Sequence, residues 1–200
     1  MDAIVQQHSG WIEVVCGSMF SGKTEELIRR VRRAQIARQK VALFKPAIDT
    51  RYSESEIVSH DAQKLPSRVV KDANEIIPLS LEAQVVAIDE AQFYKKNLVK
   101  VCKTLANMGK RVIIAGLDTD YRGEPFHPIP ELLAIAEYIT KTHAICVVCG
   151  NPANFTQRKT KSSNQVVIGT SDIYEARCRN CYELLVEPVK KGRQKEKKKR

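Results

Sequence analysis

The sequence predicts an α/β fold in which a mostly parallel sheet carries helices on both faces. Three observations favour this class. Short apolar runs alternate with segments of helical periodicity through the first two thirds of the chain, glycine and proline separate them, and the cysteine pairs come only after them. Successive parallel strands require crossover helices, and such helices cover both faces of the sheet.

The first expected unit is a strand, a turn and a helix. Trp11–Cys16 is an apolar run, which predicts a buried strand, and Gly17 opens the turn that follows. Residues 24–39 predict a helix because their apolar side chains recur on one face: Leu27, Ile28, Val31 and Ala34. The arginines of this helix fall mainly on its other faces.

The remaining elements continue the alternation. Strands are predicted by short apolar runs at residues 41–44, 68–70, 84–88, 111–115 and 138–141, the last of them at a sheet edge. Helices are predicted at residues 97–108, which Gly109 ends, and at residues 129–136, which two prolines precede. This order indicates a series of βαβ units.

The composition limits the class of protein. A chain of 200 residues with 43% hydrophobic and 28% charged residues has the size of one domain with a small appendage and the make-up of a folded protein. No apolar run approaches the roughly 20 residues that cross a bilayer, and the first ten residues are polar. We therefore expect a soluble, cytoplasmic protein with no membrane anchor.

Residues 17–24 read Gly-Ser-Met-Phe-Ser-Gly-Lys-Thr and fit the phosphate-binding pattern Gly-x-x-x-x-Gly-Lys-Ser/Thr, between a predicted strand and a predicted helix. Glycines let backbone amides turn toward phosphate oxygens, and the helix N-terminus adds positive potential. Lys23 is expected to reach the β- and γ-phosphates, and Thr24 to offer a hydroxyl to Mg²⁺. The pattern predicts an ATP site built from the whole loop: Gly17, Ser18, Met19, Phe20, Ser21, Gly22, Lys23 and Thr24.

Two acids end the strand predicted at residues 84–88. An acid at the carboxyl end of a neighbouring parallel strand lies near the phosphate loop, where Asp89 can hold Mg²⁺ through its water shell. Glu90 then projects toward the group that accepts the phosphoryl group, which makes it the candidate general base. Paired acids also occur at strand ends for structural reasons, and the phosphate loop favours the catalytic interpretation.

Four of the six cysteines form two Cys-x-x-Cys pairs: Cys146, Cys149, Cys178 and Cys181. Two such pairs supply four thiolates to a closed tetrahedral Zn²⁺ site, which is structural because no coordination position stays open. Disulfides are disfavoured by the cytosolic ATP-site context, and a redox pair by the duplicated motif. Cys16 and Cys102 are expected to be buried apolar residues, and His143 is a minor candidate ligand.

The sequence divides into three parts. We expect an ATP-binding α/β domain at residues 1–142, a loop-rich zinc-binding domain at residues 143–188 and a disordered basic tail at residues 189–200. The net charge is +10, and residues 190–200 alone contribute +7, so the body of the chain is nearly neutral. Nucleic acid is therefore not an expected partner, apart from a weak electrostatic contact of the tail.

Four segments together resemble the zinc-containing thymidine kinases. They are the phosphate loop, the run Lys45-Pro-Ala-Ile-Asp-Thr-Arg-Tyr, the run Asp89-Glu-Ala-Gln-Phe and the cysteine pairs, in the family's order over residues 12–184. The resemblance implies a P-loop fold of the RecA-like kind and transfer of the γ-phosphate of ATP to the 5′-hydroxyl of thymidine, with Mg²⁺ as cofactor and structural Zn²⁺. It also implies nucleoside salvage for DNA synthesis, a homotetramer and feedback inhibition by thymidine triphosphate.

The resemblance implies roles for single residues. Glu90 takes the proton of the 5′-hydroxyl, and Arg51 neutralises charge on the transferred group from a mobile segment that includes Asp49. Asp49, Asp89 and Gln92 join the phosphate loop in cofactor binding. The segment between the cysteine pairs resembles the family's lasso loop, which covers the nucleoside. Family positions around the base and sugar match Met19, Phe93, Leu117, Tyr121, Thr156, Val167, Ile168, Gly169 and Tyr174.

Two other functions fit parts of the pattern. A zinc-ribbon ATPase that binds nucleic acid would use the phosphate loop as a motor and the tail as a grip, but the near-neutral body, the lack of a second motor domain and the 6% aromatic content weigh against it. A non-catalytic nucleotide switch is the other alternative. ADP release that depends on thymidine separates the kinase from both.

Overall fold

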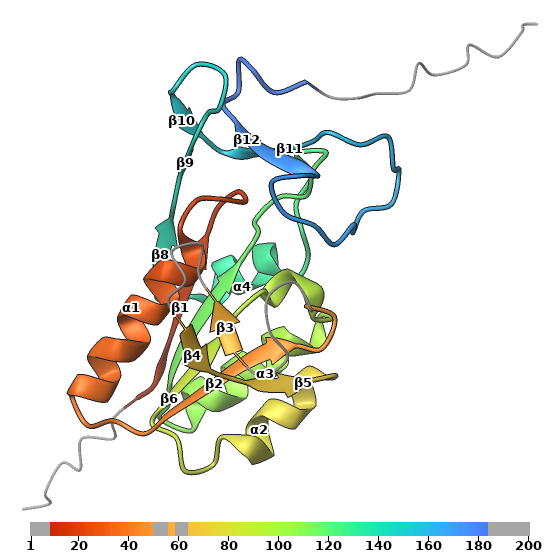
Figure 1. The fold of residues 1–200 in the computed structure, drawn as a ribbon. Helices are drawn as coiled ribbons and strands as arrows, with labels where there is room; N and C mark the ends of the chain where they lie inside the picture. The colour runs from red at the N-terminus through yellow and green to blue at the C-terminus, as the bar shows by residue number, and fades with distance from the viewer. Residues whose placement is uncertain (1–8, 50–55, 59–63, 184–200) are drawn as a thin grey trace, which may run out of the picture.

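The computed structural model describes residues 9–49, 56–58 and 64–183, and a six-stranded sheet forms its centre (Figure 1). The strand order is β5-β2-β6-β7-β1-β8, and every pairing in this sheet is parallel. The strands are β1 (Trp11–Cys16), β2 (Val41–Pro46), β5 (Arg68–Val70), β6 (Val85–Ile88), β7 (Arg111–Gly116) and β8 (Tyr138–Lys141). The predicted α/β class and the edge position of β8 are confirmed.

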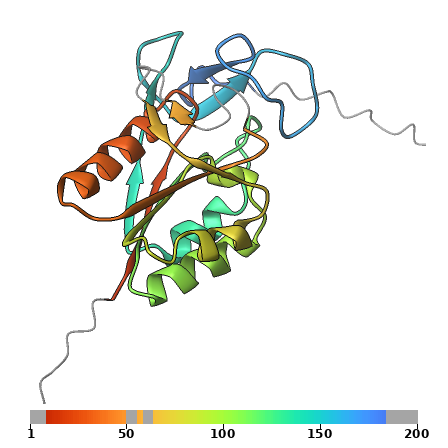
Figure 2. The ribbon, with the colours of Figure 1, turned by 60° about the horizontal axis from the view of Figure 1, so that its bottom comes forward.

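Helices cover both faces of the sheet, as predicted. On one face, α1 (Lys23–Ile36) packs its apolar stripe against alternate strand residues such as Val15. On the other face lie α2 (Ile76–Leu79), α3 (Asn97–Asn107) and α4 (Ile129–Ile135), which share a second core with the intervening strand residues. Figure 2 shows α1 on the opposite side of the sheet from α3.

The boundaries of the helices differ from the prediction by a few residues where the sequence carries no stop signal. α1 ends at Ile36 rather than at residue 39, because Arg38 adopts a left-handed φ of 58° that no glycine announces. α3 ends at Asn107, and the expected stop, Gly109, has a φ of 80°. Long apolar stretches therefore predict where the helices lie, whereas the conformation of the residues after the last turn determines where they end.

Several short elements were not predicted, because segments of two to four residues give only a weak periodic signal. They are α2 and the following: β3 (Glu56–Val58), β4 (Lys64–Pro66), η1 (Ala73–Glu75), η2 (Ala91–Phe93), β9 (Ala144–Ile145), β10 (Pro152–Ala153), β11 (Phe155–Arg158) and β12 (Tyr174–Arg177). Strands β9 to β12 form two antiparallel pairs at one end of the molecule (Figure 1). We call this part, with its four paired cysteines, the cysteine unit.

One detail of the predicted sheet is wrong. The strand that ends at Asp89 is not a direct neighbour of the strand that leads into the phosphate loop, because β7 lies between β6 and β1. The carboxyl ends of these parallel strands nevertheless lie at one sheet edge, and α1 starts there. Thr24, in the first turn of α1, reaches across to Asp89 with 3.2 Å between its Oγ1 and Asp89 Oδ2.

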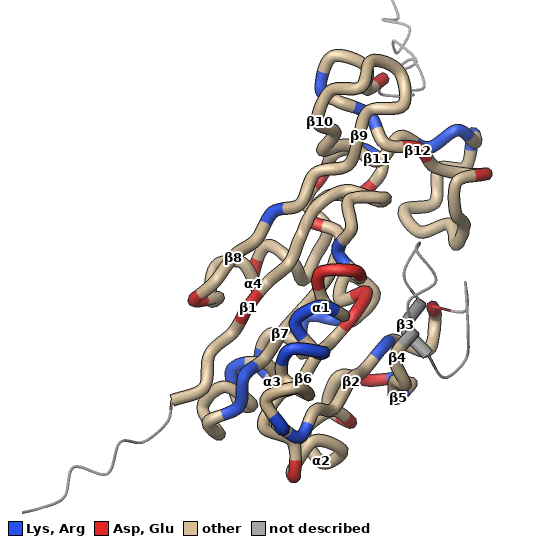
Figure 3. Tube along the Cα trace, turned by 60° about the vertical axis from the view of Figure 1, so that its left-hand side comes forward, with Lys and Arg blue, Asp and Glu red and all other residues tan. Residues whose placement is uncertain are grey.

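Charged residues are unevenly distributed over the described part of the chain. Figure 3 shows Lys and Arg along α1, with acidic residues at its start. Glu25 and Glu26 lie in the first turn of this helix, where negative charge complements the helix dipole.

Among the described helices, none has the length and apolarity needed to cross a membrane.

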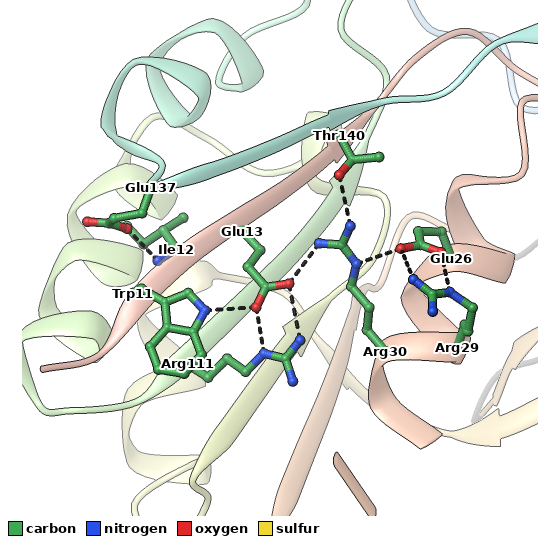
Figure 4. A network of polar contacts seen from close by, with 9 residues as sticks. All are labelled: Trp11, Ile12, Glu13, Glu26, Arg29, Arg30, Arg111, Glu137 and Thr140. Atoms are coloured by element: carbon green, nitrogen blue, oxygen red, sulfur yellow. Dashed lines mark hydrogen bonds and ion pairs between the residues drawn. The ribbon is translucent and has the colours of Figure 1, made fainter. Parts of the chain in front are cut away.

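A buried carboxylate ties the sheet to α1 (Figure 4). Glu13 of β1 is 6% exposed and accepts hydrogen bonds from Trp11 Nε1 at 2.8 Å, Arg111 Nε at 2.6 Å and Arg30 Nη1 at 2.7 Å. Arg30 Nη2 also donates to Thr140 Oγ1 of β8 at 2.9 Å. This network joins three neighbouring strands and the helix that follows the phosphate loop.

Candidate active site

The phosphate loop joins β1 to α1 through backbone conformations that glycine permits. Gly17 has a φ of 144°, and a Cβ there would lie 2.3 Å from the carbonyl oxygen of Thr142. Gly22 has a φ of 80° and precedes the first helical residue, Lys23. Both positions are restricted to glycine, one by space and one by conformation, which explains the spacing of the motif in physical terms.

Hydrogen bonds within the loop and to Thr142 hold the loop side chains in place. Ser18 is buried, and its carbonyl oxygen accepts hydrogen bonds from Lys23 Nζ at 2.7 Å and Ser21 Oγ at 2.8 Å. Ser21 Oγ also lies 2.8 Å from Thr142 Oγ1. The ammonium of Lys23 is thus folded over the loop, at the place where the pattern predicts the β- and γ-phosphates.

Asp89 and Glu90 follow β6 at the same sheet edge. Asp89 is 5% exposed, and its Oδ1 accepts the amide N–H of Glu90 at 3.0 Å. Glu90 has a left-handed φ of 50°, an uncommon conformation for a residue with a Cβ. Backbone strain of this kind clusters at functional sites, and Glu90 lines a cavity together with the loop residues 19–25.

Gln92 is buried beside Glu90 and orients it. Its Nε2 donates to Glu90 Oε2, and its Oε1 accepts the amide N–H of Leu117 at 2.9 Å. The amide of Gln92, which is 3% exposed, therefore links the carboxylate after β6 to the backbone after β7. The structure places Gln92 behind Glu90 in this way, and the role in cofactor binding that the family resemblance implies for it stays a prediction.

Two adjoining cavities lie over the sheet edge. One is lined by residues 19–25 together with Glu90 and Leu117. The other is lined by all nine residues that the resemblance assigned to base and sugar: Met19, Phe93, Leu117, Tyr121, Thr156, Val167, Ile168, Gly169 and Tyr174. Asp49 and Phe126 also line it, and Met19 and Leu117 border both cavities. We call these the loop cavity and the apolar cavity.

The wall of the apolar cavity comes from the segment between β11 and β12. Residues 165–169 of this segment line the cavity, and Tyr174 Oη donates to the carbonyl oxygen of Val167 at 2.8 Å. Phe93 meets Phe126 edge to face, with ring centroids 6.4 Å apart. Aromatic and aliphatic side chains with few polar groups make a site for a flat, weakly polar ligand.

The four paired cysteines form one cluster. Their sulfur atoms all lie within 4.8 Å of one another, and Cys149 Sγ and Cys178 Sγ are 3.5 Å apart. All four are free thiols. Sulfurs bound tetrahedrally to one Zn²⁺ at about 2.3 Å lie about 3.8 Å apart, so the cluster fits that ion. His143 is not part of the cluster, which among the described residues contains cysteines alone.

The other two cysteines are buried, as predicted. Cys16, next to Gly17, is 1% exposed, and Cys102 of α3 is fully buried. Burial and the nearby carboxylate of Asp118 raise the pKa of the Cys16 thiol to about 11. Burial also raises the pKa of Cys102. Burial therefore favours the protonated form of both thiols, which is the weaker nucleophile.

Two predicted features lie outside the described residues. They are Arg51, assigned to the transferred phosphoryl group, and the basic tail at residues 189–200. Both stay predictions. Asp49, predicted to lie near Arg51, is described and sits at the wall of the apolar cavity.

Comparison with known proteins identifies the family of this chain. The family model described as thymidine kinase matches residues 10–182. The chain belongs to the thymidine kinase family. The match includes the phosphate loop, the residues that line both cavities and the four clustered cysteines.

Several thymidine kinases share more than half of their aligned residues with this chain. The thymidine kinase of Rhodothermus sp. (strain ITI 518) is 58% identical over 186 residues, which cover 92% of this chain and 87% of the relative. Those of Bacteroides thetaiotaomicron and Bdellovibrio bacteriovorus are each 56% identical, over 86% and 89% of this chain and 87% and 88% of the relatives. AMPPCP-bound DnaA from Aquifex aeolicus aligns over 68% of this chain and 42% of its own, with 14% identity and a TM-score of 0.42, too low a likeness to bear on the fold.

Membership in this family implies ATP and thymidine as substrates and Mg²⁺ as cofactor. The four-cysteine cluster is compatible with zinc. The P-loop sheet supplies the phosphate site that an ATP-dependent kinase needs.

Proposed function

We propose that the chain transfers the γ-phosphoryl group of ATP to the 5′-hydroxyl of thymidine, giving ADP and thymidine monophosphate. The observation that carries this proposal is the junction of the two cavities. Met19 and Leu117 border both, so a nucleoside in the apolar cavity points its reacting end toward Glu90 and the loop. Holding the acceptor and donor in line in this way supplies much of the rate enhancement of phosphoryl transfer.

Glu90 is the general base in this proposal. The 5′-oxygen forms a bond to the γ-phosphorus while the bond from that phosphorus to the β,γ-bridging oxygen breaks, and the electron pair of the broken bond leaves with ADP. The hydroxyl proton passes to the Glu90 carboxylate. Gln92 donates to that carboxylate and keeps it aimed at the loop cavity, which makes Gln92 a positioning residue.

The phosphates of ATP are bound by the loop and by Lys23. Amide groups of residues 17–22 and the N-terminus of α1 complement the phosphate charge, and Lys23 contacts the transferred group. Thr24 and Asp89, 3.2 Å apart, would hold Mg²⁺, which supplies positive charge to the β- and γ-phosphates when bound. Asp49 joins the cofactor-binding set, and Arg51 neutralises charge on the transferred phosphoryl group.

Zinc in this proposal holds the cysteine unit together. The apolar core of that unit consists of Ala144, Ala153 and Ala176 with Cys146 and Cys178, and it is too small to be stable without a bound metal. Four thiolates leave no open coordination position, so the ion stays structural. The sheet has two large apolar cores of its own, whereas the cysteine unit has only this small one. We therefore divide the chain at residue 142 into an ATP-binding part and a zinc-binding part.

Further family properties extend the proposal to the assembly and its regulation. They are a homotetramer, feedback inhibition by thymidine triphosphate, a cytoplasmic location and a role in nucleoside salvage. Family membership supports all four.

The test compares acceptors on one zinc-loaded preparation. ADP release from Mg-ATP is measured with thymidine, deoxycytidine, single-stranded DNA or no addition, and thymidine monophosphate is identified by mass. ADP release that requires thymidine and matches the monophosphate formed is the expected result. Release driven by DNA, or by nothing, would refute the proposal in favour of a DNA-dependent or uncoupled ATPase.

A pair of variants tests the base. Glu90→Gln removes the proton acceptor at constant size and should lower kcat by about 10²- to 10⁴-fold while ATP still binds. Glu82→Gln makes the same chemical change at an exposed side chain away from both cavities and should keep wild-type activity. Wild-type turnover by Glu90→Gln would rule out Glu90 as the base.

A further inference from the structure

Arg158, which the sequence analysis did not single out, is the largest fully buried side chain of the described residues. It ends β11, lies opposite Tyr174 of β12 and is 1% exposed. It also lines the apolar cavity. Arginine is almost never this deeply buried unless it is paired, so its contacts indicate its task.

The guanidinium of Arg158 gathers the backbone of the cavity wall. Nη1 donates to the carbonyl oxygens of Ser162, at 2.9 Å, and Asn164. Nη2 donates to the carbonyl oxygen of Gln165 at 3.0 Å and to Tyr174 Oη at 2.9 Å, and Tyr174 in turn holds the carbonyl oxygen of Val167. One planar group thereby fixes the course of residues 162–167.

The same guanidinium stacks on a residue from the sheet domain. Its Cζ lies 3.5 Å from the centroid of the Tyr121 ring, within cation–π range. Tyr121 Oη donates to the carbonyl oxygen of Ser163 at 3.3 Å, and the exposed Arg122 donates to the same carbonyl and to Tyr121 Oη. Tyr121 lies in the segment that follows β7, five residues after the strand ends at Gly116, so the stack connects the cavity wall to this segment.

The charge of Arg158 is not used to neutralise an acid. Among the described residues no carboxylate pairs with it, and its Nε is buried without a hydrogen-bond partner. Burying a cation against carbonyl dipoles and a ring is costly, and an apolar side chain would fill the space at lower cost. The contacts therefore indicate that Arg158 fixes the position of the cavity wall rather than stabilising the fold.

We propose that Arg158 is a positioning residue for the nucleoside: it sets the 162–167 wall at the distance from Tyr121 that thymidine binding requires. This inference rests on the proposed function. Lysine cannot replace it, because an ammonium concentrates its donors on one atom and has no plane to stack, whereas the guanidinium fork serves separated carbonyls and a ring at once.

The test separates binding of the nucleoside from folding. Arg158→Lys should raise the KM for thymidine about fivefold or more, with the KM for ATP unchanged and kcat within about threefold of wild type, since the reacting groups are untouched. Arg179→Lys, the same change at an exposed arginine of the cysteine unit, is the matched control and should leave the KM for thymidine unchanged. A purely structural role would lower the active fraction, and hence kcat, at constant KM.

Limited proteolysis gives a readout that does not depend on activity. Lys159 and Lys161 lie in the exposed part of the segment, and trypsin cleavage after them, followed by mass spectrometry, should be several-fold faster in Arg158→Lys than in wild type. Arg158→Met serves the same measurement if the lysine variant does not fold. A KM for thymidine less than fivefold above wild type, or unchanged cleavage at these lysines, would overturn the inference. A wild-type enzyme inert toward thymidine would instead refute the proposed function, and the cleavage rates would still decide whether Arg158 holds the wall.

Discussion

Replacing Glu13 by glutamine removes one negative charge from the centre of the network that joins β1, β7 and α1 (Figure 4). The carboxylate accepts four hydrogen bonds, one from Trp11, two from Arg111 and one from Arg30. A glutamine of the same size keeps one carbonyl oxygen with two acceptor sites and turns an amide toward the arginines. At least two charge-assisted hydrogen bonds are therefore lost.

The expected loss of stability follows from burial. A hydrogen bond to a charged group contributes about 1.5–3 kcal/mol, and breaking a buried ion pair costs about 3–5 kcal/mol. The side chain of Glu13 is 8% exposed, but those of Arg30 and Arg111 are 12% and 22% exposed, so water screens part of the effect. We expect Glu13→Gln to lower the free energy of unfolding by about 3 kcal/mol.

Urea unfolding measures this loss, with far-UV circular dichroism and the fluorescence of the single tryptophan, Trp11, as probes. Coincident transitions in both probes and an unchanged m-value would show that only stability has changed. Glu82→Gln, at the exposed Lys40–Glu82 pair, is the control and should change the free energy of unfolding by less than about 1 kcal/mol. A Glu13→Gln protein as stable as this control would refute the reasoning that the network stabilises the sheet.

Three further outcomes are expected. Hydrogen bonds from Arg29 and Arg30 lower the pKa of Glu26 from 4.5 to about 2, so its stabilising effect is complete above pH 4.5 and is lost as the pH falls through 2. Glu26→Gln should therefore flatten the dependence of the free energy of unfolding on pH in this range. An unaltered slope would contradict this expectation. Lys23→Ala should weaken ATP binding about 10- to 100-fold in calorimetric titration, and an unchanged Kd would count against the phosphate contact. Cys178→Ser should lose zinc, measured as metal content, whereas full zinc content would disprove the four-thiolate site.

The sequence was sufficient where chemistry depends on local spacing. The phosphate loop is one continuous run whose glycines adopt φ values of 144° and 80°, and the cysteines come in two short motifs. Strands with apolar runs were equally visible: β1 lies at the predicted residues, and so does the short, mostly exposed edge strand β8. In each of these cases the residues that determine the structure are neighbours along the chain.

Two residues have contacts in the structure that no sequence motif marks. Gln92 bridges Glu90 to Leu117, 25 residues on, whereas the family resemblance implied only that Gln92 takes part in cofactor binding. Arg158 is the clearer case, because its partners are backbone carbonyls, which every residue possesses. An arginine at the end of a short strand is normally solvated, and no side chain in residues 162–165 marks the place where the guanidinium is bound.

The cysteine unit and the phosphate loop are in direct contact, so we expect metal binding at the cysteines to influence both substrate sites. Phe20 packs against the small core around the cysteines, and Met19 N donates to Thr156 Oγ1 of β11 at 3.0 Å. β11 ends in Arg158, which holds the wall of the apolar cavity. None of the four cysteines lines either cavity. Loss of the metal should nevertheless lower the affinity for both thymidine and ATP. Strand β11, next to the cysteine cluster, contacts both the wall of the apolar cavity and the phosphate loop.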